Sequence, residues 1–187
     1  MHIFNRSILV ALLLLCSMPF IFAEDDAMIL RCVAFYNLEN VFDTIHDEGK
    51  NDYEYLPDGG MKWTSFKYEQ KIQNMAYAIA QLGTDEDPRG AACVGVSEVE
   101  NIGCLHDLCK ELKEKHNRTY EPILLEGPDR RGVDVGFLYN PSMFKPVSVK
   151  GYELKAHYAD GGEVKSRLQL WISGYMLDDD RKIVRDK

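Results

Sequence analysis

Two short and almost uninterrupted apolar runs constrain the fold more than any other feature of the chain. Residues 29–36 (ILRCVAFY) and residues 91–96 (AACVGV) contain one charged side chain between them. Such runs are typical of strands that are buried on both faces of a sheet. Between them, residues 64–82 repeat apolar side chains at helical spacing, with Thr64 or Ser65 as the cap and Gly83 as the stop. This order of elements predicts an α/β fold.

The remaining pattern adds one helix and further strands. A helix is predicted to end near His116, after apolar positions that begin at Leu105. Strands are predicted over residues 120–125 and 133–139, an extended segment over 144–157, and a half-exposed strand over 164–176, followed by a turn at 178–180. Residues 44–62 are polar and form a long loop, and loops of that length usually serve a function or are disordered.

The first residues are predicted to be a targeting segment. Residues 7–23 are almost wholly apolar, Arg6 precedes them, and an acidic run follows. This pattern predicts a signal peptide over residues 1–23 and an exported domain over residues 24–187, in the periplasm, at the cell surface or secreted. The alternative is an uncleaved anchor, which Pro19 near the end of the run disfavours. After cleavage no stable membrane span is expected.

The cysteines do not pair in any obvious way. Cys104 and Cys109 lie five residues apart on one predicted helix, and Cys32 and Cys93 lie in apolar runs. Buried free thiols are therefore favoured, although an exported protein could also oxidise them to disulfides.

The chain is acidic, with 22 Lys and Arg against 30 Asp and Glu and a formal net charge of -8. This balance argues against holding nucleic acid by net positive charge, and it favours a small substrate over long DNA. A local basic groove or a contact bridged by a metal ion stays open.

Polar clusters follow both apolar runs. Asn37, Glu39 and Asn40 follow the first, and Glu98 and Glu100 follow the second. Sites in open α/β sheets lie beyond the carboxyl ends of the strands, so Asn37 and Glu98 converge if the two strands are neighbours. A carboxylate with an amide oxygen suits Mg²⁺. The alternative is that these residues only cap the strands.

A third cluster surrounds a glycine in residues 127–139 (GPDRRGVDVGFLY). Arg131 and Asp134 there could bind phosphate and orient a partner group. The alternative is a turn that carries solvated charges.

Together these motifs resemble the endonuclease/exonuclease/phosphatase family, whose fold is DNase I-like. FYNLENVFD (residues 35–43), GVSEVEN (95–101) and EGPDRRGVDVGFLYNP (126–141) are similar to three family motifs in order and spacing. The resemblance covers roughly residues 29–177 and implies a four-layer α/β/β/α sandwich, of which this chain supplies roughly the N-terminal half.

The resemblance also implies roles for individual residues. Glu98 would be the ligand of Mg²⁺ or Mn²⁺, and Asn37 would lie beside it. Arg131 and Asp134 would contact or organise the scissile phosphate, and Arg167 is similar to a phosphate-binding arginine of the family. Further acidic neighbours with less defined roles are Glu39, Asp43 and Glu100.

The resemblance implies a divalent-metal-dependent phosphodiester hydrolase that acts on nucleic acid or a small phosphoester. The family's later motifs, including an Asn-His pair and a terminal Asp-His pair, have no counterpart here. The chain is therefore expected to be truncated at its C-terminus and nearly inactive alone. The alternatives are a non-catalytic binding remnant, which could self-associate through an exposed sheet, and a phosphatase for small phosphoesters or lipid head groups.

Overall fold

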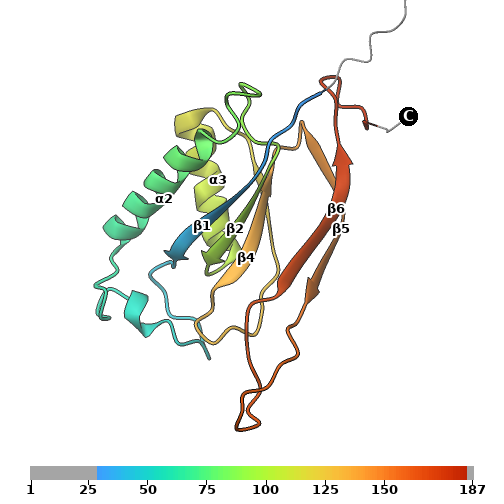
Figure 1. The fold of residues 1–187 in the computed structure, drawn as a ribbon. Coiled ribbons are helices and arrows are strands. Elements are labelled where there is room, and N and C mark those ends of the chain that lie inside the picture. Colours follow the sequence, from blue (N-terminus) through green and yellow to red (C-terminus); the bar gives the residue numbers. More distant parts are fainter. Residues whose placement is uncertain (1–28, 185–187) are drawn as a thin grey trace, which may run out of the picture.

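A four-stranded sheet forms the centre of the fold in the computed structural model, which describes residues 29–184 (Figure 1). Its strand order is β1 (Val33–Val41), β2 (Cys93–Val99), β4 (Asp134–Tyr139) and β3 (Glu121–Leu124). β1 runs parallel to β2, and β4 runs antiparallel to both β2 and β3. The predicted signal peptide, residues 1–23, lies outside the described residues and stays a prediction.

Two helices cover one face of this sheet (Figure 1). They are α2 (Ser65–Ala80) and α3 (Ile102–His116), close to the bounds that the sequence predicted. The main core joins these helices to the sheet and includes Leu38, Val94, Val96, Leu138, Ile72, Ile79, Leu105 and Leu112. The side chain of Asn101 caps α3 by accepting a hydrogen bond from the backbone N–H of Cys104 at 3.0 Å.

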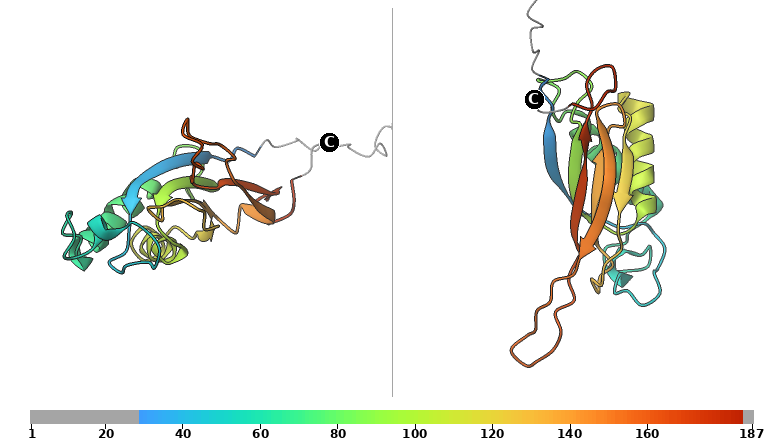
Figure 2. Two further views of the ribbon diagram at one scale, coloured as in Figure 1. Left: turned by 90° about the horizontal axis from the view of Figure 1, so that it is seen from below. Right: turned by 90° about the vertical axis from the view of Figure 1, so that its right-hand side faces the viewer.

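A hairpin of β5 (Phe144–Tyr152) and β6 (Gln169–Met176) lies on the other side of the sheet from the helices (Figures 1 and 2). A second, smaller core joins the hairpin to the sheet through Cys93, Phe137, Tyr139, Phe144 and Met176. The ring of Phe144 meets the rings of Phe137 and Tyr139 edge to face, with centroids 5.8 and 6.1 Å apart. The fold therefore contains two β layers and a helical layer.

The prediction that the first strand is buried on both faces is wrong. Val33 is 63% exposed and Phe35 is 66% exposed, whereas Leu38 is fully buried beneath the helices. The difference arises because the hairpin packs over β2 and β4 and leaves β1 uncovered at the edge of the sheet. β1 also continues to Val41, so Asn37 lies within the strand rather than after it.

The half-exposed strand is confirmed, but it begins later than predicted, at Gln169. Leu170 and Ile172 are partly buried, whereas Trp171 between them is 44% exposed. The four described cysteines are free thiols, as favoured from the sequence. Burial raises the pKa of the Cys93, Cys104 and Cys109 thiols to about 12. No helix in residues 29–184 is long and apolar enough to span a bilayer.

An ion network ties the start of the sheet to the end of the hairpin. The Arg31 guanidinium, whose side chain is 8% exposed, contacts Asp87 at 3.1 Å and Asp179 at 2.8 Å. Arg89 contacts the same two carboxylates, each at 2.7 Å. Arg89 is also the main reason that the pKa of Asp87 lies below its ordinary value. Arg31 therefore joins its own segment to Asp87 and to Asp179, which are distant from it in the chain.

We expect Asp87→Asn to lower the free energy of unfolding by roughly 1–3 kcal/mol, because Arg31 loses a buried charged partner. The Asp87 pKa is depressed, so its stabilising contribution is present above about pH 4 and is lost as the pH falls through the folded-state value. Urea unfolding at several pH values measures this. The control is Asp180→Asn, since Asp180 forms only an exposed pair with Lys182 and should cost little. An equal loss of unfolding free energy in the two variants would contradict the stabilising role of Asp87.

Candidate functional site

Asn37 and Glu98 lie on the neighbouring strands β1 and β2, which run parallel, as the expected convergence of the two residues requires. Asn37 pairs in register with Ser97, the residue before Glu98. The Ser97 hydroxyl donates to Asn37 Oδ1 at 3.2 Å, and the backbone N–H of Glu39 donates to the same oxygen at 3.1 Å. These two bonds orient the Asn37 amide at the end of the sheet.

The backbone around this point is strained. Glu39, Asn40 and Glu98 have φ values of 54°, 64° and 63°, in the left-handed region that non-glycine residues rarely adopt. The strand register shifts between Ser97 and Val99 and between Asn37 and Val41, so both strands are irregular at the same level. Strained backbone and bulges of this kind occur often at functional sites, where they direct a side chain.

One cation contacts the Glu98 carboxylate, and a second contacts the backbone of Glu39. Arg167 Nη2 lies 3.4 Å from Glu98 Oε1, and the side chains of these residues are 26% and 21% exposed. Lys71, from the middle of α2, donates to the Glu39 carbonyl at 2.8 Å. Burial lowers the pKa of Lys71, and the negative charges of Glu39 and Glu98 oppose that shift. The structure therefore places Arg167 in contact with Glu98, a contact that the sequence did not predict.

Tyr55 and Arg131 come from two different loops, and the charges of Arg131 and Glu98 both act on the Tyr55 hydroxyl. Tyr55 lies on a short 3-10 helix (Tyr53–Tyr55), and its ring stacks on Phe42 with centroids 4.1 Å apart. Burial is the main cause that raises the pKa of Tyr55, with smaller effects from the charges of Arg131 and Glu98. Arg131 is exposed, and its Nε lies 3.5 Å from Asp129 Oδ1. The guanidinium therefore lies where an anion in solvent can reach it.

Asp134 has a different environment from the other predicted site residues. It is buried, and its Oδ1 accepts a hydrogen bond from the backbone N–H of Gly127 at 2.9 Å. Burial raises its pKa to about 6. A Cβ added to Gly127 would lie 2.9 Å from this oxygen, so the loop approaches Asp134 closely. The observed bond shapes the loop that carries Arg131.

The acidic neighbours Asp43 and Glu100 form a separate cluster with Cys104, in which one ligand atom of each lies within 4.8 Å of the others. Glu100 accepts a hydrogen bond from the backbone N–H of Asp43 at 2.8 Å, and Asp43 accepts one from Asn101 Nδ2 at 3.0 Å. Burial raises the pKa of Glu100 to about 8. Since Mg²⁺ prefers oxygen ligands, the thiol makes this group a poorer magnesium site than an all-oxygen set.

Sequence reasoning missed Ser97, Lys71 and Tyr55 as members of the site. Ser97 adjoins Glu98 in the motif, and its register with Asn37 could have been inferred from parallel pairing. Lys71 and Tyr55 gave no signal, because their positions depend on how α2 and the loop before it pack against β1.

We expect Glu100→Gln to remove a pH dependence of stability. Between about pH 4.5 and 8 the folded chain holds a proton on Glu100 that the unfolded chain releases, so stability falls as the pH rises, by at most about 1.4 kcal/mol per pH unit. Glutamine mimics the protonated acid and should flatten this slope. Urea unfolding from pH 5 to 8 in metal-free buffer measures it, with the exposed Glu114→Gln as control. An unchanged slope in Glu100→Gln would show that Glu100 ionises normally.

Comparisons with known proteins bear on the family of the chain. Two solved structures are similar: a functionally unknown conserved protein from Enterococcus faecalis, at 14% identity and a TM-score of 0.39, and an endonuclease/exonuclease/phosphatase from Bacteroides vulgatus, at 15% identity and a TM-score of 0.42. The matches cover 77% and 80% of this chain but 46% and 48% of those structures, so the chain spans about half their length. No curated protein matches the sequence.

A family model matches most of the sequence. The model of the Endonuclease/Exonuclease/phosphatase family aligns with residues 32–186, which include the strained strand ends, the Arg131 loop and Arg167. The chain therefore belongs to the Endonuclease/Exonuclease/phosphatase family.

Proposed function

We propose that this chain carries part of the centre of a divalent-metal-dependent phosphodiester hydrolase, with Mg²⁺ or Mn²⁺ as the ion. The observation that carries the proposal is the position of Glu98, whose carboxylate lies at a strained strand end within reach of Arg167. Family membership supports a hydrolase fold of the DNase I-like type. The activity of the whole protein is part of the proposal, since the chain spans about half of the structures it matches.

The donor atoms fit a hard divalent cation. Glu98 contributes carboxylate oxygens, of which Oε1 contacts Arg167. The amide oxygen of Asn37 already accepts two hydrogen bonds, which use both of its lone pairs, so Asn37 would lie beside the ion, and its NH2 group would donate to a phosphate oxygen. Glu98 would hold the ion, and the bound ion would supply Lewis-acid polarisation of a phosphoryl oxygen.

The cationic side chains would hold the substrate. Arg167 and the exposed Arg131 present guanidinium groups that can bind non-bridging phosphate oxygens in bidentate fashion. Lys71 adds positive charge close to Glu98. Asp134 would act indirectly. Its carboxylate holds the Gly127 backbone and therefore the loop that presents Arg131. These contacts orient a phosphodiester, and orientation of this kind supplies much of the catalysis of phosphoryl transfer.

We expect Glu98→Gln to weaken Mn²⁺ binding at least tenfold, about 1.4 kcal/mol, because the anionic ligand is removed. Calorimetric titration of the chain with Mn²⁺ measures this without requiring turnover. The matched control is Glu86→Gln, an exposed acid at the opposite end of the sheet, which should bind as the parent does. Equal Mn²⁺ affinity in Glu98→Gln and the parent would refute the assignment of the metal ligand.

Arg167→Ala should change two affinities in opposite directions. Removing the guanidinium beside Glu98 should strengthen Mn²⁺ binding roughly fivefold, about 1 kcal/mol, because a competing cation is lost. The same variant should weaken binding of inorganic phosphate, which loses a charged donor. Both affinities come from titration calorimetry. A fall in both would indicate that Arg167 only supports the fold of the site, as would reduced thermal stability of the variant.

A further inference from the structure

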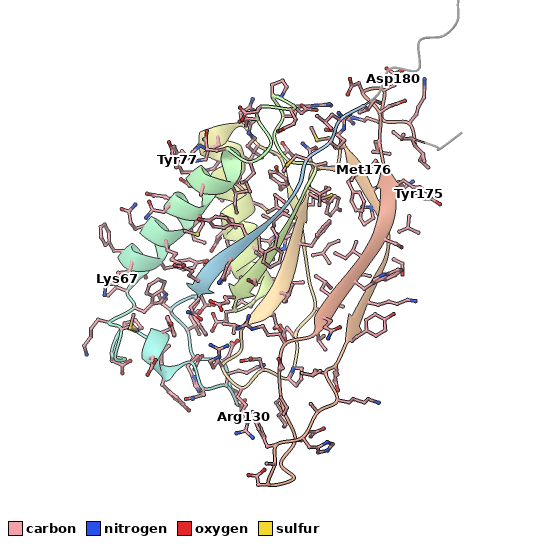
Figure 3. All side chains as sticks on the ribbon, viewed as in Figure 1. Lys67, Tyr77, Arg130, Tyr175, Met176 and Asp180 are labelled. Carbon is pink, nitrogen blue, oxygen red and sulfur yellow. The ribbon has the colours of Figure 1, made fainter. Side chains whose placement is uncertain are left out.

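A second cationic pocket lies close to the candidate centre, and none of the roles assigned above uses it. It has a volume of about 390 Å³, and its lining includes the cations Lys50, Arg130 and Lys165 together with Asn51, Pro128 and Asp129. Figure 3 labels Arg130 below the ends of the central strands, at the end of the sheet that carries Asn37 and Glu98. The pocket therefore opens beside the proposed phosphate-binding residues.

Two chain segments contribute residues both to this pocket and to the candidate centre around Glu98. Arg130 lines the pocket and adjoins Arg131, whose charge acts on Tyr55 near Glu98. Lys165 lines the pocket and precedes by two residues Arg167, which contacts Glu98. Alternate residues of an extended segment are at most about 7 Å apart. The two cation pairs are thus close enough to engage neighbouring groups of one ligand.

Lys50 is held in place at the wall of this pocket. Its Nζ donates to the carbonyls of Gly127 at 3.2 Å and Asp129 at 3.3 Å, which leaves a third N–H for a ligand. Its aliphatic stem crosses Gly132, where an added Cβ would lie 3.3 Å from Lys50 Cγ. The φ of Gly132 is +88°, so the turn itself favours glycine.

Three cations and one carboxylate, that of Asp129, line the pocket. Within residues 29–184, no carboxylate lies within salt-bridge distance of Lys50, Arg130 or Lys165. The Asp129 carboxylate is turned instead toward Arg131, with its Oδ1 accepting the Arg131 backbone N–H at 2.9 Å. The charge of Lys50 acts on the carboxyls of Asp47 and Asp134 without forming an ion pair. In a chain of net charge -8, three cations that form no ion pair within the described residues and line one hollow indicate a site for an anion.

We propose that this pocket binds a second phosphate group of the substrate, next to the phosphate held by Arg131 and Arg167. The inference rests on the proposed function and narrows its substrate to phosphodiesters that carry at least one further phosphate. A nucleotide chain and a small bisphosphate share this chemistry. The pocket would raise affinity and set which phosphodiester bond reaches Glu98.

The test compares ligands that differ by one phosphate. We expect the chain with Mn²⁺ to bind thymidine 3′,5′-bisphosphate at least tenfold more tightly than thymidine 5′-monophosphate, measured by calorimetry at fixed ionic strength because phosphate contacts are sensitive to salt. The double variant Arg130→Ala/Lys165→Ala should lose this difference and keep the monophosphate affinity. The control is Lys113→Ala/Lys115→Ala, which removes the same charge from the exposed last turn of α3.

The outcomes separate this inference from the proposed function. If the Arg130/Lys165 variant keeps the preference for the bisphosphate, or if the parent shows none, the second site is refuted while the monophosphate site stands. Failure of the parent to bind either ligand would overturn both proposals. The affinities for fructose 1,6-bisphosphate and fructose 6-phosphate identify the kind of ligand. Tighter binding of the bisphosphate in the thymidine pair alone supports a nucleotide chain as the ligand. Tighter binding of the bisphosphate in both pairs supports any small bisphosphate.

Discussion

Burial of one face of the central sheet beneath α2 and α3 is the interaction on which the rest of the structure depends. Side chains alternate along a strand, so the burial of Tyr36 and Leu38 against the helices directs Asn37 to the opposite face. Ser97 follows the same logic on β2, since Val94 and Val96 pack beneath the helices. The core therefore determines that the Asn37 amide and the Ser97 hydroxyl meet at the end of the sheet.

The backbone of β1 and β2 departs from regular strand geometry at the residues proposed to form the site. Glu39, Asn40 and Glu98 all have positive φ, at a cost of about 1–3 kcal/mol each. Packing of the two strands on either side of these residues, with Val41 and Val99 both buried, holds the irregular backbone. A regular strand would continue to alternate its side chains across the sheet. The bulge instead leaves the Glu98 side chain partly exposed beside Arg167.

Patterns in the sequence predicted the helices and the order of the motifs well, because helical spacing and apolar runs reflect local geometry. The same reasoning failed for the first strand, where an uninterrupted apolar run lies at an edge with Phe35 exposed. An apolar run shows that a segment can be buried, but it does not show what covers it. The expectation that Asn37 lies near Glu98 depended only on β1 and β2 being parallel neighbours, and the structure pairs Asn37 with Ser97, the residue before Glu98.

The amino-acid order alone settles the α/β class, the family motifs and the residue types that suit a metal and a phosphate, because these depend on short-range spacing and on side-chain chemistry. Contacts between distant segments decide which charges come together: Arg167 with Glu98, Lys71 with Glu39, and Lys50 with the loop at Gly127. They also raise the pKa of Glu100 and bury Asp134, since only the packed chain removes water from a carboxylate. Proximity and desolvation belong to the folded chain and are not properties of any local pattern.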